Sequence, residues 1–486
     1  MRAIVVGGGI GGLATARGLA LRGWDVTVLE RQPTLEAAGA GLSLWPNALL
    51  ALDWLGLGDR VRAAGAPITG GGLRTASGTW LTRVRMTAPP VDAPSTAHPV
   101  TAPHPAGGVP HGAGGAAHLA HPAHAAGGVP HPADAAGGVP HGAGGAAHLA
   151  HPAHAAGGVP HPADAAGGVP HAAGGAAYLA HPAGGASDGG AGVGAGGPIV
   201  VHRADLHEIL ADGLEVRTGA EVRDVRELDA DLIVGADGIG SVVRAAYAPQ
   251  VRIRDSGQVS WRAVVPAEAM GGALEGGETM GPGGLRFGHV PMGRRGVYWY
   301  AAAPAPLRTD AKETQLDQLR RAFGGWHVPI PALLAATDPA TLLHHPLLDL
   351  HPVAPMRFGA RTALVGDAAH AMTPNLGQGA CQALEDAVTL AGFVPAGDTG
   401  RDGEVEAALR RYDAERRPRV ALVARRSWQV GRVAGARGAV ASAVVRTLAR
   451  LTPASATTRG AERIAAWTPP TPSPVVAPAG PGGGRP

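Results

Sequence analysis

Three glycines near the N-terminus have the spacing that lets a polypeptide backbone approach a phosphate group. Gly7, Gly9 and Gly12 follow a short apolar run at 3–6, and residues 13–22 continue with helical spacing. In such a motif the first glycine permits a tight turn, the second leaves room for a pyrophosphate, and the third allows a helix to pack closely on a strand. The helix N-terminus then offers free N–H groups and a positive dipole to the phosphates. The pattern predicts a strand, a phosphate-binding loop and a helix.

An acidic residue follows the second predicted strand, at the position where it could bind the ribose of a dinucleotide. A second apolar run at 25–29 leads to Glu30, which lies 23 residues after Gly7. At about this distance from a glycine loop, a carboxylate can accept hydrogen bonds from ribose hydroxyls. The strand–helix–strand unit therefore predicts dinucleotide binding, although this motif alone does not separate FAD from NAD.

Two further acidic residues follow apolar runs later in the chain. The run at 232–235 leads to Asp237, and the run at 363–365 leads to Asp367. A loop rich in proline and glycine comes after Asp367, and a helix is predicted to begin near Gly379. Because ligands bind outside the carboxyl ends of the strands in an open α/β sheet, both carboxylates are expected at a binding site.

Aromatic and basic side chains gather on strands predicted in the second half of the chain. Side chains alternate between the two faces of a strand, so Tyr298 and Tyr300 share one face and Trp299 takes the other. One face would line a substrate pocket and the other would pack. The candidate substrate contacts are Trp261, Arg262, His289, Tyr298 and Tyr300. The alternative for each of them is a place in the hydrophobic core.

A low-complexity insert interrupts the chain of 486 residues. Residues 111–140 are repeated without change at 141–170, and glycine, alanine, proline and histidine dominate 89–197. Each repeat has too few large apolar side chains to offset the entropy of ordering a glycine-rich chain. We therefore expect a disordered surface loop. Its regularly spaced histidines leave a metal site as the alternative reading.

Charge and cysteine content exclude several classes of protein. The 41 basic and 38 acidic residues give a net charge of +3, and no basic run is long enough for a nucleic-acid patch. Cys381 is the single cysteine, which excludes an intramolecular disulfide; a small buried role is expected for it rather than a reactive thiolate. No apolar run approaches the roughly 20 residues of a membrane span. A cytoplasmic protein without a membrane span is expected.

The three acidic and glycine motifs, in this order, resemble those of class A FAD-dependent aromatic monooxygenases of the para-hydroxybenzoate hydroxylase type. The nearer resemblance is to the branch that contains salicylate, hydroxybenzoate and urate hydroxylases. The segments at 39–47, 202–207 and 296–300 are also typical of that branch. The resemblance covers essentially all residues outside the insert and the C-terminal tail.

The resemblance implies a set of FAD contacts along the whole cofactor. The pyrophosphate would lie on Gly7, Gly9, Ile10, Gly11 and Gly12; the adenosine on Glu30, Arg31 and Val222; the cofactor surface on Ser43 and Arg203; the ribityl chain on Asp367; and the flavin ring on Pro374, Asn375, Leu376, Gly377, Gln378, Gly379 and Ala380. Asp237 and Arg244 resemble a motif implicated in binding both FAD and NAD(P)H. The positive end of the helix near Gly379 would face the flavin and stabilise its anionic reduced form.

Two residues near the expected flavin are candidates for a catalytic role. Pro374 would shape the face of the flavin at which O₂ reacts. His370 lies three residues after Asp367. It would serve either as a proton relay or as a hydrogen-bonding group behind the site, and the second role is favoured.

The implied fold is α/β, with a Rossmann-like FAD-binding domain interrupted by a mixed-sheet substrate domain. The expected divisions are the FAD domain at 1–88, 198–250 and 353–400, the insert at 89–197, the substrate domain at 251–352, C-terminal helices at 401–467 and a disordered tail at 468–486. The C-terminal helices are a candidate homodimer contact. Only 28 residues separate Arg203 from Leu232, so the sheet layer that usually covers the adenine is expected to be trimmed.

The implied reaction is hydroxylation of a small aromatic or heteroaromatic substrate by O₂ through a flavin C4a-hydroperoxide, with NADH or NADPH as co-substrate. A flavin halogenase would need a lysine near the substrate, and the single lysine, Lys312, lies in a polar segment. An FAD-dependent epoxidase or dehydrogenase of the same fold stays open. A metal-binding or interaction protein with a vestigial flavin fold is a further alternative.

Overall fold

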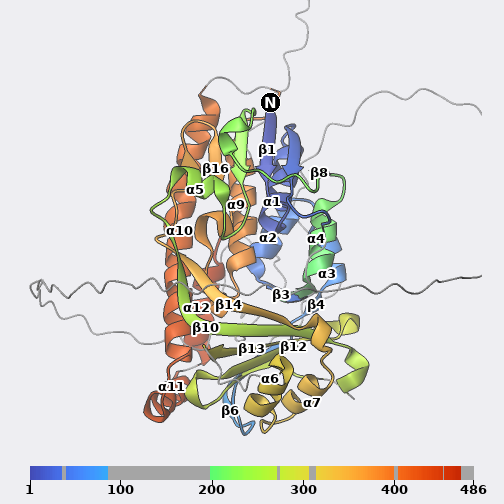
Figure 1. The fold of residues 1–486 in the computed structure, drawn as a ribbon, viewed down its shortest axis with the longest axis vertical. Coiled ribbons are helices and arrows are strands. Elements are labelled where there is room, and N and C mark those ends of the chain that lie inside the picture. Colours follow the sequence, from blue (N-terminus) through green and yellow to red (C-terminus); the bar gives the residue numbers. More distant parts are fainter. Residues whose placement is uncertain are drawn as a thin grey trace, which may run out of the picture. The chain divides into compact units, whose positions relative to one another are not determined.

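The computed structural model describes residues 1–35, 40–85, 197–270, 274–305, 314–398, 403–452 and 454–471 (Figure 1). The perfect repeats at 111–170 and the end of the chain from 472 onward lie outside the described residues. The predictions of disorder and of a metal-binding alternative for the insert are therefore not addressed by the structure.

A six-stranded sheet forms the first part of the fold. Its strand order is β15-β16-β9-β1-β2-β8, and all neighbours are parallel except β15 and β16. The strands are β1 (Arg2–Val6), β2 (Asp25–Leu29), β8 (Glu215–Arg217), β9 (Leu232–Gly235), β15 (Arg357–Phe358) and β16 (Thr362–Leu364). The three apolar runs that precede Gly7, Asp237 and Asp367 are thus neighbouring parallel strands, so their carboxyl ends meet at one edge.

Helices cover this sheet and connect its strands. They are α1 (Ile10–Leu21), α2 (Pro46–Trp54), α3 (Gly58–Ala64), α4 (Arg203–Ala211), α5 (Val242–Tyr247), the short α8 (Asp367–His370) and α9 (Gly379–Phe393). Figure 1 shows α1, α2 and α9 beside the blue N-terminal strands. The predicted βαβ unit and the predicted helix start at Gly379 are confirmed.

A seven-stranded mixed sheet forms the second part. Its order is β14-β10-β13-β12-β11-β5-β6, and every pair is antiparallel except β11 with β5. The strands are β5 (Gly70–Thr75), β6 (Trp80–Arg85), β10 (Arg252–Val265), β11 (Gly277–Met280), β12 (Arg286–Pro291), β13 (Val297–Pro304) and β14 (Leu343–His351). The sequence assigns residues 70–85 to the first part of the FAD domain, at 1–88. The pairing of β5 with β11 places them in the substrate-domain sheet instead.

One face of the seven-stranded sheet is sealed by apolar packing. Helices α6 (Gln315–Phe323) and α7 (Ile330–Ala335) contribute Leu319, Phe323 and Leu333 to a core with side chains of the sheet. A third, small sheet has the strand order β3-β7-β4. Its strands are β3 (Gly41–Leu44), β4 (Ala66–Pro67) and β7 (Ile199–His202). The opposite face of the seven-stranded sheet is left to line a cavity.

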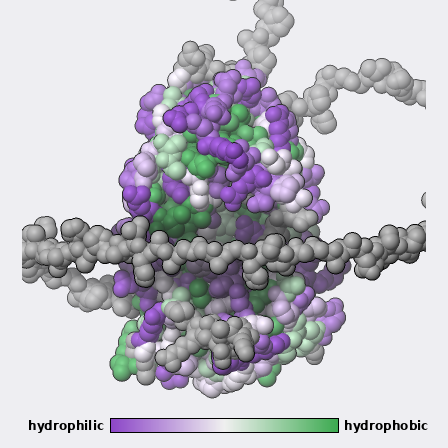
Figure 2. Space-filling model, in the orientation of Figure 1, coloured by the Kyte–Doolittle hydropathy of each residue, from purple (hydrophilic) through white to green (hydrophobic). Residues whose placement is uncertain are grey.

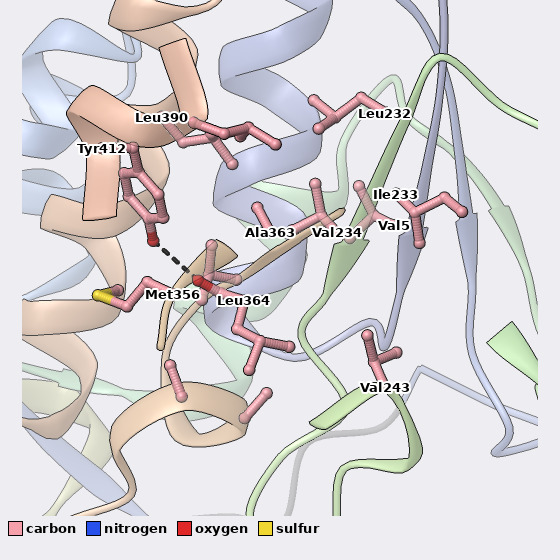
Figure 3. Close-up of a cluster of buried hydrophobic side chains, with 14 of the residues drawn as sticks. Val5, Leu232, Ile233, Val234, Val243, Met356, Ala363, Leu364, Leu390 and Tyr412 are labelled. Carbon is pink, nitrogen blue, oxygen red and sulfur yellow. Dashed lines mark hydrogen bonds between the residues drawn. The ribbon is translucent and has the colours of Figure 1, made fainter. Parts of the chain in front are cut away.

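Three helices complete the described chain. They are α10 (Glu404–Ala434), α11 (Ala439–Leu451) and α12 (Ala454–Ala465), which confirms the helical reading of this region. Tyr412 of α10 enters the core of the six-stranded sheet, and its hydroxyl donates to the Leu364 carbonyl at 2.9 Å (Figure 3). Among the helices described here, none is both long enough and apolar enough to cross a bilayer.

Candidate active site

A cavity of about 380 Å³ opens where the carboxyl edge of the six-stranded sheet meets the seven-stranded sheet. The cofactor motifs line one wall and the substrate-domain strands line the other. The lining includes Gly9, Ile10, Gly11, Ser43, Arg203, Gly238, Ser260, Arg262, Arg286, Val290, Tyr298, Tyr300, Asp367, Met372, Pro374, Asn375, Gly377, Gly379 and Ala380. Residues predicted separately for cofactor and for substrate therefore share a single cavity.

The three motif glycines differ in what requires them. Gly7 has a φ of 107°, and a Cβ there would lie 2.4 Å from the Ala236 carbonyl oxygen. A Cβ on Gly12 would lie 2.0 Å from the Gly7 oxygen. A Cβ on Gly9 would meet nothing within 4 Å, and the backbone of Gly9 is extended, at φ −74°. The protein's own packing thus explains Gly7 and Gly12, whereas the open space above Gly9 fits a bound pyrophosphate.

Glu30 is held at the end of β2 by two backbone donors. Its Oε2 accepts from the Gly8 N–H at 2.7 Å, and its Oε1 accepts from the Gln32 N–H at 2.8 Å. These bonds orient the carboxylate beside the glycine loop. A fixed carboxylate with lone pairs to spare is a suitable acceptor for the hydroxyls of a ribose.

Asp367 is exposed on the cavity wall at the first turn of α8. It follows Gly366, a turn residue with φ 57°, whose N–H donates to the buried Asp386 at 2.9 Å. Arg203 lies on the same wall. Desolvation lowers the pKa of Arg203, Asp367 opposes this effect, and Arg262 adds to the lowering. The cavity therefore holds opposite charges that a polar cofactor chain can bridge.

The loop before α9 presents backbone to the cavity. Pro374, Asn375 and Gly377 line it, while Leu376 and Gln378 are buried behind. Helix α9 begins at Gly379 without a side-chain cap, so its first N–H groups lack intrahelical acceptors. A Cβ on Gly379 would meet nothing within 4 Å. This end of α9 can donate to an anionic or carbonyl edge of a flat ring.

The predicted alternation on β13 is confirmed. Tyr298 and Tyr300 line the cavity, and Trp299 is fully buried on the other face, where its Nε1 donates to Thr337. Burial raises the pKa of the Tyr298 hydroxyl, although Arg262 acts in the opposite direction. Tyr298 therefore stays protonated at neutral pH and can donate a hydrogen bond into the cavity.

Two candidate substrate contacts do not reach the cavity. Trp261 is 2% exposed and packs in the core beneath α6 and α7, with its ring stacked on His344. His289 is 1% exposed, and its Nε2 lies 3.1 Å from the Glu275 carbonyl oxygen. Burial lowers the pKa of His289 to about 4. The neighbouring Arg262 does line the cavity, as expected.

Sequence reasoning missed Arg286, which joins the two walls. Its Nη2 donates to the Asn375 side-chain oxygen at 2.9 Å and to Gln258 at 3.2 Å, and its Nη1 lies 3.6 Å from Glu278. Asn375 in turn donates to the Ser427 carbonyl at 3.1 Å. The sequence did offer a signal for Arg286. It lies two and four residues before Gly288 and Val290 on a predicted strand, so the three residues share one face, and an arginine on that face indicates a polar cavity.

His370 lies behind the site rather than in it. It is fully buried, and its Nε2 bonds to the Asp386 carboxylate at 2.6 Å. Burial would raise the pKa of Asp386, but His370 and Arg416 outweigh this effect, and the pKa is lowered. Arg416 also pairs with Glu385, so two carboxylates of α9 are neutralised from α10. His370 therefore hydrogen-bonds to Asp386 behind the cavity and does not line it.

Four further predicted contacts do not line the cavity. Asp237 accepts from the Val242 N–H at 2.7 Å at the start of α5, and Arg244 donates to the Ala368 carbonyl at 2.9 Å. Val222 packs against the main core, and Arg31 is exposed. No strand is present between β8 and β9 among the described residues, in keeping with the expected trimming over the adenine.

Cys381 is a buried thiol in the first turn of α9. Burial raises its pKa to about 12, and its Sγ faces the Gly377 and Ser43 carbonyls. It stays a neutral thiol at physiological pH and fills a small space beside the cavity.

Known proteins match both the sequence and the fold. Residues 186–427 match the family described as FAD binding domain, and residues 2–66 match that described as FAD dependent oxidoreductase. The chain is 30% identical over 454 residues to the aurachin C monooxygenase/isomerase of Stigmatella aurantiaca, which covers 88% of each chain. It belongs to the class A FAD-dependent monooxygenases. The predicted family and cofactor are thereby confirmed.

Two further comparisons agree with this placement of the monooxygenase. It is 27% identical over 434 residues to an FAD-dependent urate hydroxylase of Klebsiella pneumoniae, covering 86% of this chain and 87% of the relative. The structure of Klebsiella pneumoniae HpxO complexed with FAD and uric acid superposes with a TM-score of 0.67 at 24% identity, covering 96% of each chain. This second likeness supports the α/β fold.

Proposed function

We propose that the enzyme hydroxylates a small aromatic or heteroaromatic ring, with NADH or NADPH as reductant and O₂ as oxidant. The single observation that carries this proposal is the shared cavity, which is lined both by the N-terminus of α9 and by Tyr298 and Tyr300 of β13. A relative that hydroxylates urate supports a planar, polar ring as substrate.

The residues present fit FAD along the cofactor wall. The space above Gly9 would take the pyrophosphate, Glu30 the ribose, Asp367 the ribityl chain, and the loop from Pro374 to Ala380 the flavin ring. When bound and reduced by NAD(P)H, the flavin supplies the activation of O₂ and the transfer of one oxygen atom, chemistry that no side chain of the chain can provide.

The other wall would hold and orient the substrate. Tyr298 keeps its proton and would donate to an oxygen or nitrogen of the ring. Arg262 would pair with an anionic oxygen or nitrogen of the electron-rich substrate and so hold the ring in the cavity. Val290, Met372 and Leu348 add apolar surface that excludes water from the ring. Arg286 would fix the position of the substrate-domain sheet relative to the loop that carries Asn375, through its hydrogen bond to the Asn375 side chain.

A spectrum and a substrate screen test this proposal. The purified enzyme should show the visible absorption bands of an oxidised flavin. NAD(P)H oxidation should be slow alone and many-fold faster with the right aromatic compound, because substrate binding gates flavin reduction in such enzymes. An Arg262→Gln variant should keep its flavin and lose most of this acceleration. A flavin-free protein, or fast NAD(P)H oxidation that no aromatic compound alters, would refute the proposal.

A further inference from the structure

Neighbouring strands of the seven-stranded sheet place Arg262 and Gly288 on either side of Tyr300. Arg262 of β10 lies opposite Tyr300 of β13, and Tyr300 lies opposite Gly288 of β12. Side chains that are directly opposed share a face of the sheet, with their Cβ atoms about 5 Å apart. Arg262 and Tyr300 both line the cavity. The Tyr300 ring therefore has the Arg262 side chain on one side and, on the other, a residue without a side chain.

The Tyr300 ring, and not the backbone conformation, requires a glycine at position 288. Gly288 lies within a strand, and its φ is outside the left-handed region. A Cβ added to Gly288 would lie 2.5 Å from the Tyr300 hydroxyl oxygen and closer still to two carbons of the ring. The outer end of the ring thus lies over Gly288, turned toward β12 and away from Arg262. We call the space between Arg262 and the Tyr300 ring the Tyr300 slot.

Tyr298 is held in a different way, from above its stem. A Cβ on Gly41 of β3 would lie 2.6 Å from the Tyr298 Cβ, an atom that is fixed to the backbone and cannot turn aside. The ring centroids of Tyr298 and Tyr300 are 6.3 Å apart. Of these two tyrosines, Tyr300 is the one whose outer ring end lies over a glycine, so its ring position is the one that a single added methyl group can change.

The Tyr300 slot offers a flat anionic ring both a cation and apolar surface. Val290, Tyr298 and Ala302 line the same cavity. Hydrophilic side chains, in contrast, cover much of the molecular surface that Figure 2 shows. A ring with an anionic oxygen can pair with Arg262 while it contacts the aromatic ring of Tyr300.

We propose that Gly288 is a positioning residue that keeps the Tyr300 slot open for the substrate ring. A side chain at this position would displace the end of the Tyr300 ring by about 1 Å or more, because carbon atoms in contact need roughly 3.5 Å. The ring would move toward the cavity and Arg262, because the β12 backbone lies on its other side. The inference rests on the proposed function, since it takes the occupant of the cavity to be an aromatic ring.

Ligand titration of the FAD-loaded enzyme, followed by the visible absorbance of the flavin, tests this role. Salicylate and urate serve as the probes, because both are planar anions at neutral pH. Gly288→Ala should raise the dissociation constant of each probe that the parent binds by about tenfold or more. In a Tyr300→Ala background the same substitution should change it by less than about twofold, because no ring remains to be displaced. In a Tyr300→Phe background the ring remains, so the loss should persist.

Gly325→Ala is the matched control for a glycine substitution in the same domain. Gly325 follows α6 and does not line the cavity, and an added Cβ there meets nothing within 4 Å. This variant should bind the probes like the parent. Gly288→Ala should keep the flavin content and melting temperature of the parent. If it failed to fold, the double variant Gly288→Ala/Tyr300→Ala should restore folding and flavin, and failure of the double variant as well would overturn the proposal.

Three binding results would also contradict the role of Gly288. They are an unchanged dissociation constant in Gly288→Ala, an equal loss with and without the Tyr300 ring, and a flavin-loaded parent that binds neither probe. The proposed function would fail separately, if no aromatic compound accelerated NAD(P)H oxidation while the probes still bound and Gly288→Ala still weakened their binding.

Discussion

At Gly9, glycine is needed for FAD binding but not for the stability of the fold. Its backbone is one that alanine adopts, and an added Cβ meets open space. Gly9→Ala should therefore change the apoprotein's free energy of unfolding by less than about 1 kcal/mol. The same methyl group would intrude on the pyrophosphate and weaken FAD binding by about tenfold or more. Urea unfolding of the apoprotein and titration with FAD measure the two effects.

Gly12→Ala is the matched control for that substitution. Its Cβ would lie 2.0 Å from the Gly7 oxygen, so it should destabilise the apoprotein by about 1–3 kcal/mol. If Gly9→Ala left FAD affinity unchanged, the glycine loop would not be the pyrophosphate site.

His289 should make stability depend on pH. Its pKa is about 4 in the folded protein and 6.5 when unfolded, so the unfolded chain binds more protons between these values. The neutral His289 ring contributes roughly 3 kcal/mol to the free energy of unfolding above pH 6.5, and this contribution is lost as the pH falls toward 4. The His289→Gln variant has no titrating group at this position. Its free energy of unfolding, measured from pH 7 to pH 4, should therefore fall less steeply than that of the parent. Parallel curves for parent and variant would show that His289 is not buried as a neutral ring.

At the scale of elements, the register between strands determines which of the predicted substrate contacts face the cavity. The alternation of side chains along one strand does not determine this. Alternation correctly paired Tyr298 with Tyr300, but it does not say which residues of a neighbouring strand share their face. In the sheet Arg262 lies opposite Tyr300, and Trp261 lies opposite Ala301. His289 lies opposite the core residue Trp299. The cofactor wall was predictable because its residues follow three strands that are parallel neighbours, whereas the substrate wall depended on pairings between distant segments.

The ion network between α9 and α10 should be essential to the cofactor wall. Arg416 is fully buried against Glu385 and Asp386, and Asp386 fixes the Gly366 turn that carries Asp367. Arg416→Met would remove the cation that these two buried carboxylates share, leaving Asp386 with His370 and Glu385 with Arg419, and should cost about 3–5 kcal/mol of unfolding free energy, with loss of flavin.

Arg410→Met provides the comparison on the same helix. Arg410 pairs with Glu406 at the surface, so its loss should cost less than about 1 kcal/mol. Chemical denaturation of both variants distinguishes the two cases. Equal stability of the two variants would show that the buried network does not hold the α9–α10 packing.

At the scale of the whole molecule, both ends of the insert meet the short segment at 68–70 that leads into β5. Arg85 lies opposite Gly70 at the start of β5, and the Pro198 carbonyl accepts from the Ile68 N–H at 2.9 Å. A few residues can therefore span the gap. Joining Met86 to Pro198 through a short Gly/Ser linker should leave flavin content and the melting temperature nearly unchanged, since loop length costs little entropy. Loss of flavin or of folding in that variant would show that the repeats pack on the enzyme.

The origin of the oxygen in the product tests the central claim most directly. The FAD-loaded enzyme is given NADH or NADPH, ¹⁸O₂ and an aromatic compound that accelerates NAD(P)H oxidation. Mass spectrometry should find one ¹⁸O atom in the hydroxylated product for each NAD(P)H consumed, the other oxygen atom leaving as water. A hydroxylated product without ¹⁸O, whose new oxygen therefore comes from water, or a dehydrogenated product without new oxygen, would contradict the assignment of a hydroxylase.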